Sequence, residues 1–217
     1  MKINFLLLLT FIFLIGCKKD KGSDQTVKYL SKDLKDYAYF KKGTWWVYKE
    51  DSSQAIDSIV VYNNMDTILI FDGSTGTPEG KYESVECRAH SFYDEYNYYY
   101  YANTTWPGLE GKQYVFRDKT KPGDFAGATI AMFDNFVLNY QLPTLSQNGF
   151  VKLVEISDSL ILINHTFYDV KKFYCSVNST ENDGETNFYF VRNLGIIRKE
   201  LLSKNETWNL VKYHIIQ

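Results

Sequence analysis

The chain has 217 residues, and its 24 basic against 26 acidic residues give a formal net charge of −2. A nucleic-acid-binding domain would show a strong basic surplus, so this balance argues against that class of protein. The length suits one domain with a sizeable core, and no second long apolar segment follows the first, so no transmembrane span is expected.

The first 16 residues form an apolar leader. Lys2 gives it a positive start, and the segment from Ile3 to Ile15 is almost entirely apolar. This segment is shorter than the roughly 20 residues that a membrane-spanning helix needs, and it has the length of the hydrophobic region of a secretory signal peptide. The sequence therefore predicts a signal peptide over residues 1–16.

The leader ends in Leu14-Ile15-Gly16-Cys17, which resembles the lipobox of bacterial lipoproteins. The resemblance implies cleavage between Gly16 and Cys17, a diacylglyceryl group on the thiol of Cys17, and acylation of the new amino terminus by a fatty acid such as palmitate. A single acyl chain binds a membrane only reversibly, whereas two or three hold a protein firmly. We therefore expect Cys17 to be a lipid attachment site.

Residues 17–26 hold the lipidated cysteine and a polar segment, KKDKGSDQ, which contains no apolar residue. Such a composition predicts a flexible tether, whose eight residues have a mean reach of roughly 16 Å. By analogy with lipoproteins of enteric bacteria, lysine rather than aspartate after the cysteine favours the outer membrane as destination. Both faces of that membrane, periplasmic and cell-surface, stay open.

A short amphipathic helix is expected directly after the tether. Val27, Leu30, Leu34 and Tyr37 recur there at steps of three and four residues, the spacing that places apolar side chains on one helical face. Gly43 ends this element.

From residue 44 onward the pattern changes to short runs of β-branched and aromatic residues. Strands are expected at 44–49, 58–63, 67–71, 82–90, 96–102, 112–117, 128–133, 150–156, 160–163, 170–177, 186–192, 196–202 and 207–216. Strands spaced so closely, without long helices between them, predict an all-β domain over 27–217, an antiparallel sheet that closes into a barrel or a sandwich.

Turn residues separate several of these runs. Asn63-Asn64 is read as a turn between two strands, and Asn182-Asp183-Gly184 is a strong hairpin signal.

Two stretches near the ends of this domain carry a resemblance. YFKKGTWWVYKEDSSQAIDSIVV (39–61) and TNFYFVRNLGIIRKELLSKNETWNLVKYHI (186–215) resemble small lipoproteins of Bacteroidota, which often have an aromatic G-x-W-W-V-Y strand early and a Phe-Tyr-Phe … Gly-Ile-Ile-Lys-Glu hairpin late. The resemblance implies a mostly β domain at the cell envelope, and it implies no activity.

Lipidation of Cys17 leaves two further cysteines, Cys87 and Cys175, both in strand-like runs. An oxidising compartment permits them to form a disulfide if their strands are adjacent. The sequence favours the alternative of two separate buried thiols, because cysteine often behaves as a small core residue.

The residue types that carry chemistry are scattered. His90, His165 and His214 lie far apart and show no metal-ligand spacing, so neither a metal nor another cofactor is expected. No G-x-S-x-G elbow occurs, and the GSTG loop at 73–76 lacks the lysine of a phosphate-binding loop. No catalytic residue is assigned, and the protein is expected not to be an enzyme.

Tyrosine crowds the middle of the chain. Tyr96, Tyr98 and Tyr100 would share one face of a strand, with Trp106 close behind. Exposed aromatic groups often mark contact surfaces, so these four residues are candidate ligand contacts. The alternative is that tyrosine occurs there only because it suits strands.

The sequence thus predicts an outer-membrane lipoprotein whose folded part is a non-catalytic binding module. Its expected partners are the membrane, through the lipid anchor, and a glycan, an apolar ligand or a protein of the cell envelope. Two alternatives stay open, namely an envelope hydrolase whose site is built from distant residues and a periplasmic carrier of lipids or lipoproteins.

Overall fold

The computed structural model describes residues 26–74, 78–93, 96–103, 112–119, 125–132, 136–143, 149–177 and 184–217. Strands dominate this part of the chain, together with one α-helix and one short 3₁₀ turn. The elements are β1 (Val27–Lys28), α2 (Lys32–Ala38), β2 (Trp45–Glu50), β3 (Ile56–Phe71), β4 (Gly80–Ser91), β5 (Tyr96–Asn103), β6 (Lys112–Lys119), β7 (Phe125–Met132), β8 (Gln141–Pro143), β9 (Gly149–Leu162), β10 (His165–Val177), β11 (Thr186–Val191), β12 (Gly195–Leu201), η1 (Leu202–Lys204) and β13 (Glu206–His214). The prediction of a mainly all-β fold is confirmed.

All the strands belong to one sheet. Its order is β7-β6-β5-β4-β3-β2-β13-β12-β11-β10-β9-β8, so neighbours follow one another along the chain except where β13 pairs with β2. Those neighbours are antiparallel, as expected, but β1 adds a parallel pairing with β4 that the sequence did not predict. Among the described strands the sheet does not close into a barrel, because its path ends at β7 and β8.

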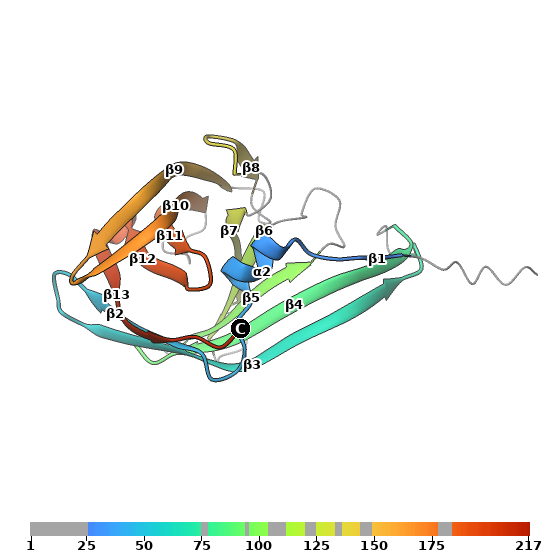
Figure 1. The fold of residues 1–217 in the computed structure, drawn as a ribbon, viewed down its shortest axis with the longest axis horizontal. Helices are drawn as coiled ribbons and strands as arrows, with labels where there is room; N and C mark the ends of the chain where they lie inside the picture. The colour runs from blue at the N-terminus through green and yellow to red at the C-terminus, as the bar shows by residue number, and fades with distance from the viewer. Residues whose placement is uncertain are drawn as a thin grey trace, which may run out of the picture.

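The sheet bends strongly, and α2 lies on its concave side. Figure 1 shows β9 to β12 folded over towards β4 and β5, with α2 between the two parts. The helix contacts β5, β6 and β12. Side chains from both parts of the sheet and from α2 form a common core, among them Leu34, Val85, Phe173, Phe190 and Leu210, each at most 2% exposed.

The helix is shorter than the periodicity predicts. Ser31 caps it, since its side-chain oxygen accepts a hydrogen bond from the backbone N–H of Leu34 at 3.2 Å. Leu34 and Tyr37 are fully buried, as the amphipathic pattern requires. Val27 lies instead in β1, so the pattern was wrong about the first turn of the helix.

Two pairs of expected strands are each one long strand. The predicted turn at Asn63-Asn64 is wrong, because β3 continues through it with a bulge between Val61 and Asn63. Asn64 is used there as a side-chain bridge. Its amide oxygen accepts from the backbone N–H of Lys42 at 2.9 Å, and its amide nitrogen donates to the hydroxyl of Tyr39 at 2.8 Å. Likewise, β9 spans both runs expected over 150–163.

The length of β3 gives the molecule an arm. β2 pairs with β3 only from Ile56 to Val60, whereas β4 pairs with it to the very end, where Phe71 faces Gly80. The arm is defined as β3 from residue 62 to 71, the facing part of β4, and β1. Figure 1 shows it extending away from the body of the molecule, with β1 alongside.

The β2–β3 turn is held by one carboxylate. Glu50 accepts hydrogen bonds from the backbone N–H and the hydroxyl of Ser53 and from the hydroxyl of Ser52. The hydrogen bonds from Ser53 are the main reason that the pKa of Glu50 falls to about 2. Asp57, at the start of β3, accepts from the hydroxyl of Ser91 at 2.8 Å.

Candidate functional site

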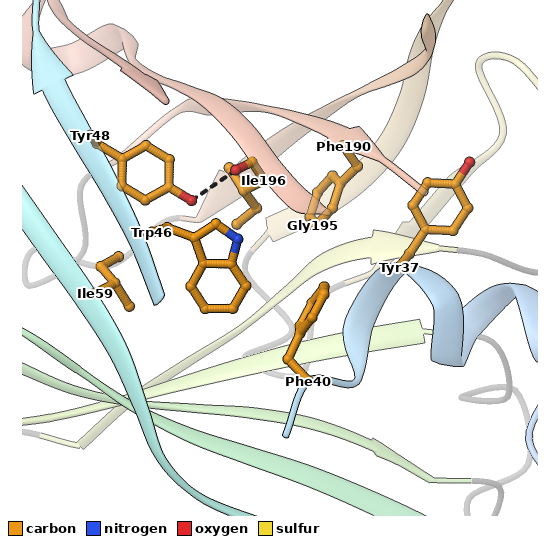
Figure 2. A pocket seen from close by; sticks show the side chains of 8 residues that line it. All are labelled: Tyr37, Phe40, Trp46, Tyr48, Ile59, Phe190, Gly195 and Ile196. Carbon is orange, nitrogen blue, oxygen red and sulfur yellow. Dashed lines mark hydrogen bonds between the residues drawn. The ribbon is translucent and has the colours of Figure 1, made fainter. Parts of the chain in front are cut away.

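A small apolar pocket lies under α2 on the concave side of the sheet. Figure 2 shows its lining, which comes from α2 and the segment after it, from β2 and β3, and from β11 and β12: Tyr37, Phe40, Trp46, Tyr48, Ile59, Phe190, Gly195 and Ile196. The cavity left among these side chains has a volume of about 20 Å³, which is close to the space that one water molecule needs. In this conformation it is therefore a gap in the core.

The side-chain polar atoms of Trp46 and Tyr48 beside this pocket already form hydrogen bonds within the protein. Tyr48 donates its hydroxyl proton to the carbonyl of Ile196 at 2.8 Å, and Figure 2 draws this hydrogen bond. The indole N–H of Trp46 donates to the carbonyl of Leu194 at 2.8 Å. The first bond joins β2 to β12 and the second joins β2 to the β11–β12 turn, so Trp46 and Tyr48 of the GTWWVY motif link these parts of the sheet.

Gly195 allows the close packing at the edge of the pocket. Its φ is +83°, and a Cβ placed there would lie 3.1 and 3.2 Å from ring carbons of Phe40. Phe40 in turn packs edge-on against Trp46, with ring centroids 5.0 Å apart. A side chain at 195 would meet both backbone strain and this ring.

Ion pairs fasten α2 over the pocket from both sides. Arg192, in the β11–β12 turn, contacts Asp33 at 2.7 Å and Asp36 at 2.9 Å. Burial alone would raise the pKa of Asp36, but hydrogen bonds and charge from Lys32 and Arg192 outweigh it, and the pKa is lowered. The neighbouring Tyr37 is more buried, and that burial raises the pKa of its hydroxyl to about 12.

On the side of the arm, α2 is held by a carboxylate of β4. Glu83 is 4% exposed, accepts from the backbone N–H of Leu30 at 2.8 Å and pairs with Lys35 at 2.5 Å. Because a buried carboxylate is costly without partners, these contacts fix the start of α2 against β4.

The two internal cysteines are buried thiols and do not form a disulfide. Cys87 lies on β4 and Cys175 on β10, strands that are not neighbours in the sheet. The Cys87 thiol accepts from the backbone N–H of Phe40 at 2.9 Å. Burial raises the pKa of each thiol to about 12. The arrangement is the one that the sequence favours.

The candidate tyrosines lie on β5. Tyr98 is half-buried and faces Ala89 of β4 in register, and Ala89 is fully buried on the concave side. Directly opposite residues share a face, so Tyr98 lies on the core side. Tyr96 and Tyr100 occupy β5, but their side chains, Trp106, and the lipid site at Gly16 and Cys17 lie outside the described residues. Their predicted roles stay predictions.

A row of five side chains, three of which carry rings, crosses the outer face of the sheet. The register places His214 opposite Trp45, Trp45 opposite Val60, Val60 opposite His90, and His90 opposite Asn97. These five residues, from β13, β2, β3, β4 and β5, therefore share one face. Their chain neighbours Trp46, Ile59 and Ala89 are buried on the concave side, so the row lies on the convex side.

Ring contacts and a hydrogen bond organise this outer row. The rings of Trp45 and His214 stack, with centroids 6.2 Å apart and planes 28° from parallel. Nδ1 of His90 lies 3.0 Å from the amide oxygen of Asn97. Phe92, one residue past the end of β4, is 64% exposed and packs edge-on against the His90 ring at 4.9 Å.

Sequence reasoning missed this row, because its members lie on five strands and are far apart along the chain. Trp45 stands in a motif that is plain in the sequence, and alternation in TWWVY would have shown that its two tryptophans point to opposite faces. The histidines lack the ligand spacing that would have marked them. Among the described residues, no group of three metal-ligating side chains occurs, and no described helix is long and apolar enough to cross a membrane.

Comparison with known proteins adds little to this picture. No family model matches the chain, and no curated protein matches it. A crystal structure at 2.70 Å of a Parabacteroides distasonis protein, provisionally named a lipoprotein, is 11% identical. The match covers 82% of this chain and 99% of that chain, with a TM-score of 0.36. A likeness this slight supports no conclusion about the fold or the function of this chain.

Proposed function

We propose that the protein is an outer-membrane lipoprotein, anchored through Cys17, whose β domain is a non-catalytic binding module of the cell envelope. The observation that carries the anchor is the leader that ends in Leu14-Ile15-Gly16-Cys17 and passes at once into a polar tether. Residues 1–16 are removed as a signal peptide, and residues 17–26 link the lipid to the folded part over 27–217.

For the binding role, the outer row offers the chemistry of a glycan contact. The half-buried Trp45, stacked on His214, and the exposed ring of Phe92 present apolar surface, while His90 and Asn97 supply polar atoms beside it. Amphipathic rings of this kind suit a ligand with both apolar faces and hydroxyl groups. The row is also broad and lies on a convex face, which suits an extended polymer better than a small molecule enclosed in a pocket.

Neither alternative gains a comparable observation. A lipid carrier needs room for an acyl chain, and the cavity under α2 has a volume of about 20 Å³, so α2 would have to leave its ion pairs first. For a hydrolase, a carboxylate would be expected beside His90; among the described residues, the His90 ring contacts the amide of Asn97 and the phenyl ring of Phe92.

The anchor is tested by mass spectrometry of the protein purified from membranes. The expected mass lacks residues 1–16 and carries the diacylglyceryl and acyl groups on Cys17. Cys17→Ser should accumulate as the uncleaved precursor. Recovery of a wild-type chain with Met1 in place, or with an unmodified thiol at 17, would refute the anchor.

The binding role is tested with the lipidated protein in nanodiscs on an array of bacterial envelope glycans. Trp45→Ala should abolish any binding that the wild type shows. Tyr168→Ala is the matched control, because Tyr168 is a 68% exposed aromatic residue of β10 that is not part of the row. Binding lost equally in both variants, or hydrolysis of an arrayed glycan, would contradict the proposed role.

A further inference from the structure

The direction of β1 determines where the chain enters the domain. β1 runs parallel to β4, with Val27 opposite Lys81 and Lys28 opposite Tyr82. β4 begins at the outer end of the arm, at Gly80, and runs towards the body. β1 runs in the same direction, from the outer end of the arm inwards, so Thr26, the described residue nearest to Cys17 in sequence, lies at the arm tip.

The lengths of the tether and of the arm limit how an anchored molecule can be oriented on the membrane. Cys17 lies nine residues before Thr26, a distance of about 17 Å on average for a flexible chain and about 30 Å when fully extended. The arm, from residue 62 to 71 of β3, spans nine steps and is about 31 Å long at ~3.4 Å per residue. With its average reach of about 17 Å, the tether extends only about half-way back along the arm, so the arm tip is the part of the described fold nearest the anchor.

The arm tip is defined as residues 27–29, 68–71 and 80–82, and most of its residues are apolar. Ile70 is 74% exposed, Tyr29 is 67% exposed and Ile68 is 39% exposed. Val27 and Ile70 both lie opposite Lys81 and so share its face. Exposed apolar side chains gathered at one end of a fold mark an interaction surface.

The other face of the tip is apolar as well, but it is packed. Phe71 meets Tyr82 edge-on with centroids 5.9 Å apart, and the ammonium group of Lys28 lies 5.1 Å from the centre of the Tyr82 ring. Tyr82 is 2% exposed. This packing stiffens the tip, so that Ile68 and Ile70 are held outwards on a firm strand pair.

We infer that the arm tip docks into the interface of the bilayer that holds the lipid anchor, with Ile70 and Tyr29 at the boundary between headgroups and acyl chains. The inference rests on the proposed anchor at Cys17. The tether makes the docking intramolecular, so a small apolar contact is enough. Isoleucine inserted beside a tyrosine is the composition that favours this boundary.

Charge does not drive the contact. Lys28 and Lys81 are offset by the exposed Asp72 and Glu79 of the same end of the arm. Docking should therefore depend little on salt or on the fraction of anionic lipid, in contrast to proteins that bind membranes through basic clusters.

The test uses the full lipidated protein in phosphatidylethanolamine–phosphatidylglycerol vesicles, with an environment-sensitive fluorophore on a single introduced cysteine. Ile70→Cys and Tyr29→Cys report on the tip. Ile161→Cys is the matched control, because Ile161 is 71% exposed and lies on the β9–β10 hairpin, at the opposite end of the molecule from β1 in Figure 1. The native cysteines should not react, since Cys87 and Cys175 are buried.

Labels at 70 and 29 should shift to the blue and be quenched by spin-labelled lipid, and the label at 161 should show neither change. Water-like spectra at all three positions, or quenching at 161 alone, would overturn the docking while the protein still floats with the vesicles. A protein that does not float with the vesicles overturns the anchor, and the docking with it. If quenching appeared only at a high density of protein on the vesicles, the tip would be contacting a second copy of the protein, and docking into lipid would be overturned.

Discussion

Gly195→Ala should destabilise the protein by more than the left-handed backbone alone can explain. The φ of Gly195 is +83°, a conformation that costs a non-glycine residue about 1–2 kcal/mol. The added Cβ would also lie 3.1 Å from Cζ of Phe40, a ring that packs against Trp46. Overpacking of this kind costs about 1–3 kcal/mol, so the total is about 2–5 kcal/mol.

Gly73→Ala provides the control for this prediction. Gly73 has the same φ of +83°, but the atoms nearest to a methyl group added there would be those of Glu79 at 3.7 Å, an ordinary contact. This variant should lose only the backbone part, about 1–2 kcal/mol. The difference between the two variants isolates the contact with Phe40.

Thermal and urea unfolding of both variants measure that difference. One kcal/mol shifts the Tm of a domain of this size by about 2–4 °C, so the Gly195 variant should melt about 2–12 °C below the Gly73 variant. Equal unfolding midpoints for the two variants would refute this prediction, because they would mean that Phe40 and the segment after α2 shift without a free-energy cost.

Three further predictions concern single groups. The pKa of Glu50 is about 2, against an ordinary 4.5. Its hydrogen bonds therefore stabilise the protein above pH 4.5, and this stabilisation is lost as the pH falls towards 2. In acid titrations, the difference in unfolding free energy between wild type and Glu50→Gln should shrink over that window. Because burial raises the pKa of Cys87 and Cys175 to about 12, neither should react with a thiol reagent at pH 8 until denaturant is added, and a requirement for reductant would reveal a disulfide instead. Ile163 has a φ of 53°, which a β-branched residue tolerates poorly, so Ile163→Asn should raise the free energy of unfolding by about 1 kcal/mol while Ile161→Asn should not.

Strand composition was enough to predict most of the fold. Runs of β-branched and aromatic residues correspond to strands along the described chain, and the burial of Leu34 and Tyr37 on one helical face was visible in their spacing. The turn predicted at Asn63-Asn64 was wrong because asparagine suits both a turn and a β-bulge, and the sequence alone does not distinguish them. Only the pairing with β4, which continues past them, distinguishes the two.

The candidate site was harder to foresee for a reason of geometry. Trp45, Val60, His90 and Asn97 meet through the register of four strands, and register depends on bulges that leave no clear mark in the sequence. The parallel docking of β1 was hidden in the same way, because Val27 fitted a helical period as well as a strand. The predictions of a signal peptide, a lipid site at Cys17 and a polar tether rest on local sequence alone, and they stay predictions.

The pairing of β2 with β13 has a consequence for biogenesis. β2 begins at Trp45 and its partner at Glu206, and the bond from the Asn209 amide to Asp51 joins residues 158 positions apart. Contacts so distant in sequence form late, and β2 keeps an open edge until the last strand has been synthesised. This edge of the sheet is therefore covered only when nearly the whole chain is available, whereas the other antiparallel strand pairs join neighbours along the chain and can form earlier.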